Sequence, residues 1–371
     1  MRLDIIRDEA GFAALEPHWD ALLEQSATPT PFMRWDWVRL WWEEFHSDYK
    51  LALAVVRDDD GVPQAIAPLM IGPEKEGMRR FMRHLGFLAG LGEAKGERMD
   101  FLVPAGREEA LTPLLCRSFH ELSGCWDAVR LNKLPEESPN HPFIVQALRE
   151  YSVGMGVVTR TECACMILES NWSAYEPKLP GKRRRELRRR WELLMMEPGS
   201  RKMQATADDA GRRMDDFAAL HALHFPKGVS SFLKPRAWRF HRRLGVLWLA
   251  GGRAMLPFIE SSGTMVGSIY GFVERREFLF FQIGWHPDYS RHSMGHLSVR
   301  WAADCCMQRG LKLFDMLPGS HRYKADWTQT TRHVLDLEGY QPESLLAIAF
   351  RTLRGLKRLL ARLTSESATA E

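Results

Sequence analysis

Two polar clusters in the second half of the chain have the residue types and spacing for chemistry. The first follows an apolar segment, Glu277 to Trp285, and places Arg291 and Gly295 just before a segment of helical spacing. A helix that begins directly after a strand presents free N–H groups and the positive end of its dipole, which bind phosphate. Gly295 would admit a diphosphate because it has no Cβ, and Ser293 could cap the helix or donate to a phosphate. A solvent-exposed turn is the alternative interpretation.

The second cluster, FDMLPGSHRYKADW, ends at Trp327 and follows another apolar segment. It places Asp315, Tyr323 and Lys324 at the carboxyl end of a predicted strand, where open α/β sheets bind ligands. Tyr323 could give a proton to a leaving thiolate, and Lys324 could hold an acyl carbonyl or a carboxylate. Alternatively, Tyr323 and Lys324 lie at the rim of the surface and Trp327 fills the core.

The segments around these clusters alternate between strand and helix patterns. The first half predicts a strand, two helices, a β-hairpin and a β-α-β unit. The second half predicts several helices, three strands, a helix and a strand; the segments nearest the clusters are 255–261, 264–274, 277–285, 294–309 and 311–317. The two halves share an order of elements without obvious sequence identity, so we predict an α/β (α+β) fold with a mixed sheet and two similar domains, 1–165 and 166–371.

The composition is that of an ordinary globular chain, with 371 residues of which 45% are hydrophobic and 26% charged. The net charge of +4 excludes a protein that coats nucleic acid generally, but it allows a local basic patch. No apolar stretch reaches the roughly 18 residues of a membrane span, and the first residues lack the apolar core of a signal peptide. Six cysteines without a CxxC pair favour a reduced, metal-free, cytoplasmic protein.

The motifs and their order resemble those of the CelD/BcsL-like branch of the GNAT (Gcn5-related) acyltransferases, whose relatives include the FemABX-type double-GNAT transferases. The resemblance covers most of the chain. It is carried by six segments: PFMRWDWVRLWWEEF (31–45), DGVPQAIAPLMI (60–71), RHLGF (83–87), GKRRRELRRRWELL (181–194), WHPDYSRHSMGHLSVRWA (285–302) and FDMLPGSHRYKADW (314–327). The last two are the more specific, because they stand in order around a helix and a strand of the expected length.

The resemblance implies two tandem GNAT-like domains in a Fem-like arrangement, with a degenerate first domain and an acyltransferase second domain. It also implies acetyl-CoA or another acyl-CoA as co-substrate. The pantetheine arm would pair with exposed backbone of the strand that ends at Trp285, and the pyrophosphate would lie on the loop and helix start that follow. The cofactor-binding residues implied are Ile283, Gly284, Trp285, Arg291, Ser293, Met294, Gly295, His296 and Leu297. Compared with the common motif Arg/Gln-x-x-Gly-x-Gly/Ala, this chain has one more residue before Gly295, and His296 stands where a small residue is usual.

Direct transfer of an acyl group needs no enzyme nucleophile, and no Ser-His-Asp or Cys-His arrangement is evident. An attacking amine must lose a proton to a base, and the departing thiolate must gain one. The Tyr323-Lys324 pair resembles the Phe/Tyr-Lys step near the transfer point in Fem-type enzymes. The residues expected in the catalytic zone are Lys324, Tyr323, Asp315 and Glu260, with His321 as a further base and Tyr289 as a further acid. Glu260 could equally be a solvated strand end, and Asp315 a structural cap.

Two basic segments have more than one interpretation. Lys182 to Arg190 (KRRRELRRR) is either a solvated or internally paired helix face, or a site for a phosphorylated substrate, CoA phosphates or tRNA. Ser344 to Leu363 is predicted to be a basic amphipathic helix. Its regularly spaced leucines, 353, 356, 360 and 363, favour packing against the chain's own domain, and contact with an anionic membrane is the alternative.

Three classes of function follow. The first is an acyl-CoA-dependent N-acyltransferase that acts on an amino sugar or on a polysaccharide or cell-envelope precursor. The second is a Fem-like transferase that uses aminoacyl-tRNA. The third is a non-catalytic GNAT-shaped subunit of exopolysaccharide or cellulose biosynthesis. The expected partner is a small-molecule or saccharide acceptor. The glycine-rich stretch Gly86 to Gly96 lacks Gly-Lys-Ser/Thr and is interpreted as a connector that could close over that acceptor.

Overall fold

The computed structural model describes residues 1–74, 77–225, 230–319 and 322–368, without the side chains of 78, 157, 158, 322 and 357–368. The chain forms two compact units. Unit 1 comprises Met1–Thr28, Phe45–Arg160 and Leu335–Glu371, and unit 2 comprises Pro29–Glu44 and Thr161–Val334. Both units are therefore discontinuous, which differs from the single boundary after residue 165 that the sequence predicts.

Unit 1 contains two groups of hydrogen-bonded strands. Its strands are β1 (Arg2–Ile6), β2 (Lys50–Leu51), β3 (Leu53–Arg57), β4 (Pro63–Ala67), β5 (Leu69–Pro73), β6 (Arg83–Phe87) and β7 (Ala128–Pro135); β8 (Val153–Ile167) and β15 (Thr331–Tyr340) run through both units. One group has the order β1-β3-β4 and the other β2-β5-β6-β7-β15-β8. Within the second, β5 and β6 are antiparallel whereas β6 and β7 are parallel.

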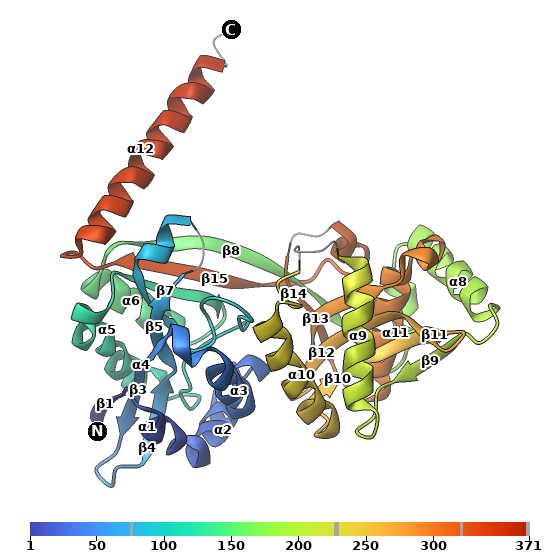
Figure 1. Cartoon of the computed structure of the whole chain (residues 1–371), viewed down its shortest axis with the longest axis horizontal. Helices are drawn as coiled ribbons and strands as arrows, with labels where there is room; N and C mark the ends of the chain where they lie inside the picture. Colours follow the sequence, from blue (N-terminus) through green and yellow to red (C-terminus); the bar gives the residue numbers. More distant parts are fainter. Residues whose placement is uncertain (75–76, 226–229, 320–321, 369–371) are drawn as a thin grey trace. The chain divides into compact units, whose positions relative to one another are not determined.

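The helices of unit 1 flank these strands (Figure 1). They are α1 (Glu9–Ala13), α2 (Glu16–Gln25), α4 (Glu108–Cys116), α5 (Ser118–Glu121), α6 (His141–Tyr151) and α12 (Leu345–Ala368), with short 3-10 turns η2 (His46–Asp48), η3 (Gly77–Phe81) and η4 (Ser123–Cys125). The glycine-rich stretch packs within this unit, because the Asn132 side chain donates to the Gly90 carbonyl and the Gly96 amide donates to Ala89.

Unit 2 repeats the pattern of unit 1 with longer strands. Its strands are β9 (Arg201–Gln204), β10 (Ala254–Met255), β11 (Pro257–Ser261), β12 (Thr264–Glu274), β13 (Glu277–Trp285) and β14 (Leu313–Pro318), in the order β8-β14-β13-β12-β11-β9, with β10 beside β12. Here β12 and β13 are antiparallel and β13 and β14 are parallel. An antiparallel pair followed by a parallel pair thus occurs once in each unit, and the predicted mixed sheet with a repeated order of elements is confirmed.

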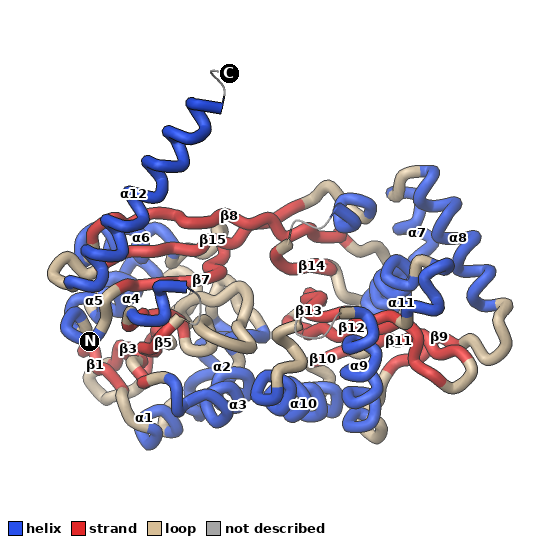
Figure 2. The backbone as a smooth tube through the Cα atoms, turned by 45° about the horizontal axis from the view of Figure 1, so that its top comes forward, coloured by secondary structure: helices blue, strands red, loops and turns tan. Residues whose placement is uncertain are grey.

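The helices of unit 2 cover both faces of these strands. They are α3 (Trp35–Phe45), α7 (Trp172–Tyr175), α8 (Gly181–Met195), α9 (Ala210–His224), α10 (Pro235–Ala250) and α11 (Met294–Gln308), with 3-10 turns η1 (Pro31–Met33), η5 (Glu176–Lys178), η6 (Pro287–His292) and η7 (Arg322–Asp326). Gly284 contacts α9, whereas Gly267, which pairs with Trp285, contacts α11. Successive strand residues face opposite sides, so α9 and α11 lie on opposite faces of β12 and β13 (Figure 2).

Residues 29–44 belong to unit 2 because their aromatic and charged side chains pack there. The fully buried Trp37 ring lies 5.0 Å from Phe240 and 5.5 Å from Phe272, measured between ring centroids. Arg34 and Glu274 form a buried bidentate ion pair, with Arg34 Nε 2.9 Å and Arg34 Nη2 2.5 Å from the two carboxylate oxygens. These contacts join residues about 200 positions apart, which explains why a linear boundary does not describe the units.

The C-terminal helix α12 packs only in part. Ala347 is buried, and the Phe350 ring lies 5.9 Å from the ring of Tyr340. Leu353 and Leu356 are 42% and 52% exposed, so the prediction that they pack against their own domain is wrong. The side chains of Leu360 and Leu363 lie outside the described residues.

Candidate functional site

The parallel strands β13 and β14 pair over only three residues each. Glu277, Phe278 and Leu279 lie opposite Leu313, Phe314 and Asp315, and β13 then continues to Trp285 without β14 beside it. A bulge in the pairing with β12 leaves Phe281 without a partner between Phe280 and Gln282. Bulges increase strand twist and redirect the chain. The second half of β13 therefore offers backbone groups on the edge that β14 has left.

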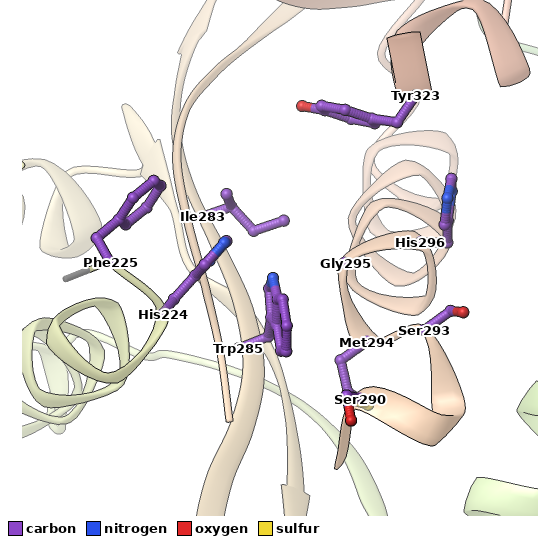
Figure 3. A pocket seen from close by; sticks show the side chains of 10 residues that line it. All are labelled: His224, Phe225, Ile283, Trp285, Ser290, Ser293, Met294, Gly295, His296 and Tyr323. Atoms are coloured by element: carbon purple, nitrogen blue, oxygen red, sulfur yellow. The ribbon is translucent and has the colours of Figure 1, made fainter. Parts of the chain in front are cut away.

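A cavity of about 460 Å³ lies beside this free half of β13. Its lining residues come from the end of α9, from β13, from η6 and the start of α11, and from η7; they are His224, Phe225, Ile283, Trp285, Ser290, Ser293, Met294, Gly295, His296 and Tyr323. Figure 3 shows His224, Phe225, Ile283 and Trp285 on one side, with the Tyr323 ring on the other and its hydroxyl directed toward the space between.

The start of α11 forms one end of this cavity without a side-chain cap. Ser293 precedes the helix with left-handed backbone angles, φ 55° and ψ 51°, and its side chain makes no capping hydrogen bond. The amides of His296 and Leu297 both donate to the Ser293 carbonyl, so the amides of Met294 and Gly295 precede the first helical hydrogen bond. Such amides are the anion-binding groups of a helix N-terminus.

Gly295 keeps this helix end open. A Cβ built on Gly295 would lie 3.8 Å from Trp285 Nε1 and 3.9 Å from Ile283 Cδ1, which are ordinary van der Waals distances. The missing side chain therefore leaves space between α11 and β13, as the sequence predicts for a ligand that approaches the backbone.

Arg291 lies outside the cavity lining. Its side chain is 73% exposed, and its Nη2 lies 2.6 Å from Glu197 Oε1, which also lies 2.8 Å from His292 Nε2. Burial works against ionisation of Glu197, but the hydrogen bonds from Arg291 and His292 outweigh it and lower the pKa of this carboxyl. Arg190 of α8 donates to the Arg291 carbonyl. The predicted phosphate ligand Arg291 is thus engaged in an ion pair at the edge of the loop.

Two other predicted cofactor residues have packing positions. Leu297 is fully buried. A Cβ on Gly284 would lie 3.0 Å from the backbone nitrogen of His221 and 3.2 Å from the Cα of His221. The lack of a side chain at Gly284 therefore allows α9 to approach β13. Of the nine predicted cofactor-binding residues, the structure brings six to the cavity: Ile283, Trp285, Ser293, Met294, Gly295 and His296.

Tyr323 is the predicted catalytic residue that lines the cavity. Burial raises the pKa of its hydroxyl to about 12, so this phenol stays protonated at neutral pH. Its neighbour Lys324 is buried, and Lys324 Nζ donates to the carbonyls of Met316 and Leu317 at 2.9 and 2.7 Å. Lys324 thus holds the end of β14, and Tyr323 directly precedes this anchored residue.

The predicted carboxylates Asp315 and Glu260 do not line the cavity. Asp315 is fully buried and accepts from Arg332 Nε and from the Leu317 amide, both at 2.7 Å. Glu260 lies 2.5 Å from Arg201 Nη2 and 3.7 Å from Arg213 Nη1. Both carboxylates are committed to ion pairs. Tyr289 is absent from the cavity lining, and His321 lies outside the described residues.

The sequence did not indicate the wall formed by His224 and Phe225. Their rings stack with centroids 4.2 Å apart, and His224 lies 4.7 Å from the ring of Trp285. Burial lowers the pKa of His224 to about 4, so its imidazole is neutral at pH 7. The available signal was the aromatic stretch His221-Ala-Leu-His224-Phe225, which begins where the helix predicted for 208–221 ends.

His221 connects α9 to the free half of β13. Its Nδ1 lies 2.8 Å from the Ile283 carbonyl and its Nε2 lies 2.8 Å from Ser230 Oγ. A carbonyl only accepts hydrogen bonds, so Nδ1 carries the hydrogen and Nε2 accepts from the Ser230 hydroxyl. Burial lowers the pKa of His221, which agrees with this neutral form.

The arrangement can hold an extended ligand with an anionic end. The cavity has apolar aromatic walls. It is faced by the free edge of β13, by the uncapped amides at the start of α11 and by the protonated phenol of Tyr323. Among the described residues, no group of three or more His, Cys, Asp or Glu side chains could hold a metal ion. No helix in the described part of the chain is both long and apolar enough to cross a bilayer.

Comparison with known proteins agrees with this geometry. Residues 181–325, which contain all ten lining residues and the free half of β13, match the family model of the acetyltransferase (GNAT) domain. The match covers less than half of the chain, and it shows that this segment is similar to GNAT acetyltransferase domains. No curated protein sequence matches the chain.

Solved structures show the fold of nearly the whole chain. The structure of FemX has a TM-score of 0.60 and 10% identity, over 92% of this chain and 97% of FemX. The C-terminal domain of a putative lysylphosphatidylglycerol synthetase from Agrobacterium fabrum has a TM-score of 0.53 and 12% identity, over 91% of this chain and 95% of that domain. A conserved protein of unknown function from Bacteroides thetaiotaomicron has a TM-score of 0.52 and 9% identity, over 87% and 97%. The predicted α/β fold with a mixed sheet and a Fem-like arrangement is thus confirmed.

Proposed function

We propose that this chain is an acyl-CoA-dependent N-acyltransferase of the CelD/BcsL-like type. The acceptor would be an amine of an amino sugar or of a polysaccharide or cell-envelope precursor. The observation that carries the proposal is the cavity between the free half of β13, the uncapped start of α11 and Tyr323, inside the segment that matches the GNAT acetyltransferase domain.

The donor would lie along the edge of β13 that β14 leaves free. Its amide-containing pantetheine arm would pair with backbone groups between Phe280 and Trp285, and its diphosphate would accept from the amides of Met294 and Gly295. The six lining residues that the motif identified support this orientation. Arg291 would reach a phosphate only by leaving Glu197, so its contribution depends on that exchange.

Transfer would proceed by direct attack of the amine nitrogen on the thioester carbonyl. The new C–N bond forms, the C–S bond breaks, the amine proton passes to water, and the sulfur departs as a thiolate that the Tyr323 hydroxyl stabilises. Backbone N–H groups at the point where β13 and β14 separate would stabilise the oxyanion, at about 3 kcal/mol per donor. Since Asp315 and Glu260 are held by arginines, either one would act as a base only through water. The neutral His224 adds no positive charge that would repel an ammonium acceptor.

An aminoacyl-tRNA donor is the second candidate, and the basic helix α8 is the observation that favours it. Three of its arginines are paired: Arg183 with Asp326 and Glu186, Arg188 with Glu176, and Arg190 with Glu186. Four further cations of α8 form no ion pair within the described residues: Lys182, Arg184, Arg185 and Arg189. Because Arg190 donates to the Arg291 carbonyl, α8 itself lies beside the loop that leads to the phosphate end of the site.

Binding of acetyl-CoA by calorimetry tests the donor, and two helix glycines give a matched pair of variants. Gly295 is the second residue of α11, and Gly211 is the second residue of α9, where a Cβ would meet only Arg242 Nη2 at 3.8 Å. We expect Gly295→Val to abolish binding and Gly211→Val to retain it. At one hundred times its Kd, acetyl-CoA should stabilise the wild-type protein by about 2.7 kcal/mol. Equal affinity in both variants would contradict the proposed site.

Release of free thiol from acetyl-CoA with a panel of amino sugars then tests turnover. Turnover with an amino sugar supports the acyltransferase. Binding without turnover by any acceptor favours the non-catalytic subunit. Transfer from aminoacyl-tRNA, lost when Arg184 and Arg185 are changed to Ala, favours the second candidate. In that case, affinity should also fall steeply with salt, because several phosphates are contacted.

A further inference from the structure

Apolar side chains gather on one helix of unit 1. The thirteen large hydrophobic residues that are exposed in the described chain include five within twelve residues of α12, with exposed fractions from 42% to 81%: Leu345, Leu346, Ile348, Leu353 and Leu356. At 100° per residue these side chains fall on one side of the helix, which we call the leucine face. The helix extends outward from unit 1 (Figure 1).

The opposite side of α12 is fixed to unit 1. Ala347 is fully buried, and Arg354 Nη1 lies 2.6 Å from Glu338 Oε1 and 2.9 Å from the Tyr340 hydroxyl. Arg79 of η3 binds the other oxygen of Glu338 at 2.5 Å. These contacts set the rotation of the helix about its axis, so the outward direction of the leucine face is a consequence of packing.

We propose that the leucine face is a docking surface for an anionic lipid membrane. The helix carries five basic residues against one acid, Glu366: Arg351, Arg354, Lys357, Arg358 and Arg362. A basic helix with leucines on one face lies in the plane of the membrane interface, with its apolar side among the headgroups and acyl chains. Basic residues next to the membrane are attracted by anionic headgroups.

The same charge argues against a second copy of the chain as the occupant. With Arg354 neutralised by Glu338, each helix keeps a net charge of +3, and two such helices would repel one another when their leucine faces meet. An anionic bilayer presents the opposite charge and an apolar interior at the same place. The described helices do not include one that crosses a bilayer, so contact would be at the surface.

An exposed apolar side chain outside α12 lies close to the first turns of this helix. Phe81 of η3 is 63% exposed, and the Arg80 guanidinium lies over its ring at 4.7 Å. Arg79, two residues earlier, contacts both Glu338 and, at 5.8 Å, the ring of Phe350 of α12. An aromatic ring with an adjacent arginine is a typical residue pair of the membrane interface, and it extends the surface beyond the helix.

Flotation of the full chain with lipid vesicles tests the proposal. We expect the protein to float with vesicles of phosphatidylcholine and phosphatidylglycerol, and to float at least tenfold less with phosphatidylcholine alone. The double variant Leu353→Glu/Leu356→Glu should lose binding by at least tenfold, because it places two carboxylates on the leucine face. Leu247→Glu is the matched control, since Leu247 is 44% exposed on α10, and it should bind like the wild type.

Three results would overturn the proposal. Equal flotation with neutral and anionic vesicles would remove the role of charge, and equal flotation of the double variant and the wild type would remove the role of the leucine face. A wild-type dimer that the double variant dissociates, without vesicle binding, would identify a second copy as the occupant. Transfer to a water-soluble acceptor should be unchanged in the double variant, which keeps this test separate from that of the proposed function.

Discussion

Tyr323 shows how burial changes the role of a single residue. Its pKa of about 12 lies above the value of about 8.5 that is usual for a thiol. The phenol is therefore the weaker acid: its pKa exceeds that of the thiol by about 3.5, so complete transfer of its proton to a thiolate would be unfavourable. We infer that Tyr323 acts mainly as a hydrogen-bond donor to the sulfur as its charge develops, and that the thiolate takes its proton later from water.

Replacing Tyr323 by Phe should lower kcat by about 10²-fold, within the range for loss of one hydrogen bond to a developing charge. The KM for acetyl-CoA should change by less than threefold, because the ring still fills the cavity. Tyr289→Phe is the control, since Tyr289 does not line the cavity, and it should retain full activity. Steady-state kinetics at pH 8 measures both variants. Unchanged turnover in Tyr323→Phe would show that the sulfur is stabilised elsewhere.

The sequence identified the part of the site that one continuous segment supplies. Seven lining residues lie between Ile283 and His296, and the resemblance to a strand, a loop and a helix start in family order implied all of them except Ser290. The structural roles of Lys324 and Asp315 could not be predicted from the motif, because the type of a charged residue does not show which group it pairs with. Asp315 pairs with Arg332, which is seventeen residues further along, and Lys324 binds carbonyls of the preceding strand.

At the scale of elements, the position of α9 determines the width of the cavity. The helix reaches β13 only because Gly284 lacks a side chain, and His221 then bonds to the Ile283 carbonyl. His224 and Phe225 enter the cavity wall as a result. This contact between a helix and a strand about sixty residues apart has no sequence pattern, which is why the aromatic wall was not predicted.

Two glycine-to-alanine changes on either side of the cavity should have different effects. A Cβ on Gly284 would lie 3.0 Å from backbone of α9, so Gly284→Ala should displace the helix and destabilise the protein by about 1–3 kcal/mol. Gly295→Ala meets only atoms at 3.8 Å or more and should change stability by less than about 0.5 kcal/mol. Urea unfolding at pH 7 measures both. Equal stability of the two variants would show that α9 is not held at this distance.

Helix α10 contributes a pH dependence through His241. This residue is buried among the rings of Phe232, Phe240 and Phe281, and burial lowers its pKa to about 3. In the unfolded chain a histidine has a pKa of about 6.5. Between these values the unfolded state binds the extra proton, so stability falls as the pH falls below about 6.5.

Lowering the pH from 7 to 5 should therefore remove about 2 kcal/mol of stability through His241 alone, at 1.36 kcal/mol per pH unit below 6.5. His241→Leu should remove this part of the pH dependence and should cost little at pH 7, because no hydrogen bond to Nδ1 is lost within the described structure. His120→Leu, at an exposed histidine, is the control. Chemical unfolding at both pH values gives the result, and parallel losses in wild type and His241→Leu would contradict it.

Secondary structure near the site was predicted well, but one long strand, β15, was missed. The predicted segments 255–261, 264–274, 277–285 and 294–309 agree with β11, β12, β13 and α11 within one or two residues. Strand β15 has no counterpart among the predictions. It contains the buried carboxylates Asp336 and Glu338, which are compensated by Lys133 and by Arg79 and Arg354. From the sequence alone, charged residues in a strand are predicted to be exposed, because their pairing partners are not known.

At the scale of the whole molecule, the chain enters each unit more than once. Residues 29–44 complete unit 2 although about 115 residues of unit 1 separate them from its remainder. The hydrophobic periodicity of a sequence predicts local elements, but it does not show that the chain leaves a unit and enters it again later. The predicted domains 1–165 and 166–371 therefore do not coincide with the units. An exchange of this kind predicts that neither unit folds as a continuous fragment.

A fragment of residues 161–334 should therefore fail to unfold cooperatively, because it lacks α3 and η1. Without Arg34, Glu274 becomes a buried unpaired charge, at a cost of about 3–5 kcal/mol. Without Trp37, the rings of Phe240 and Phe272 border a void that costs about as much again. Together these losses match the 5–15 kcal/mol of a typical fold.

Adding a peptide of residues 29–44 should restore a cooperative transition, whereas the same peptide with Arg34→Ala and Trp37→Ala should not. Thermal unfolding followed by near-UV circular dichroism measures both mixtures, and a fragment that unfolds cooperatively without peptide would show that residues 29–44 are dispensable for unit 2.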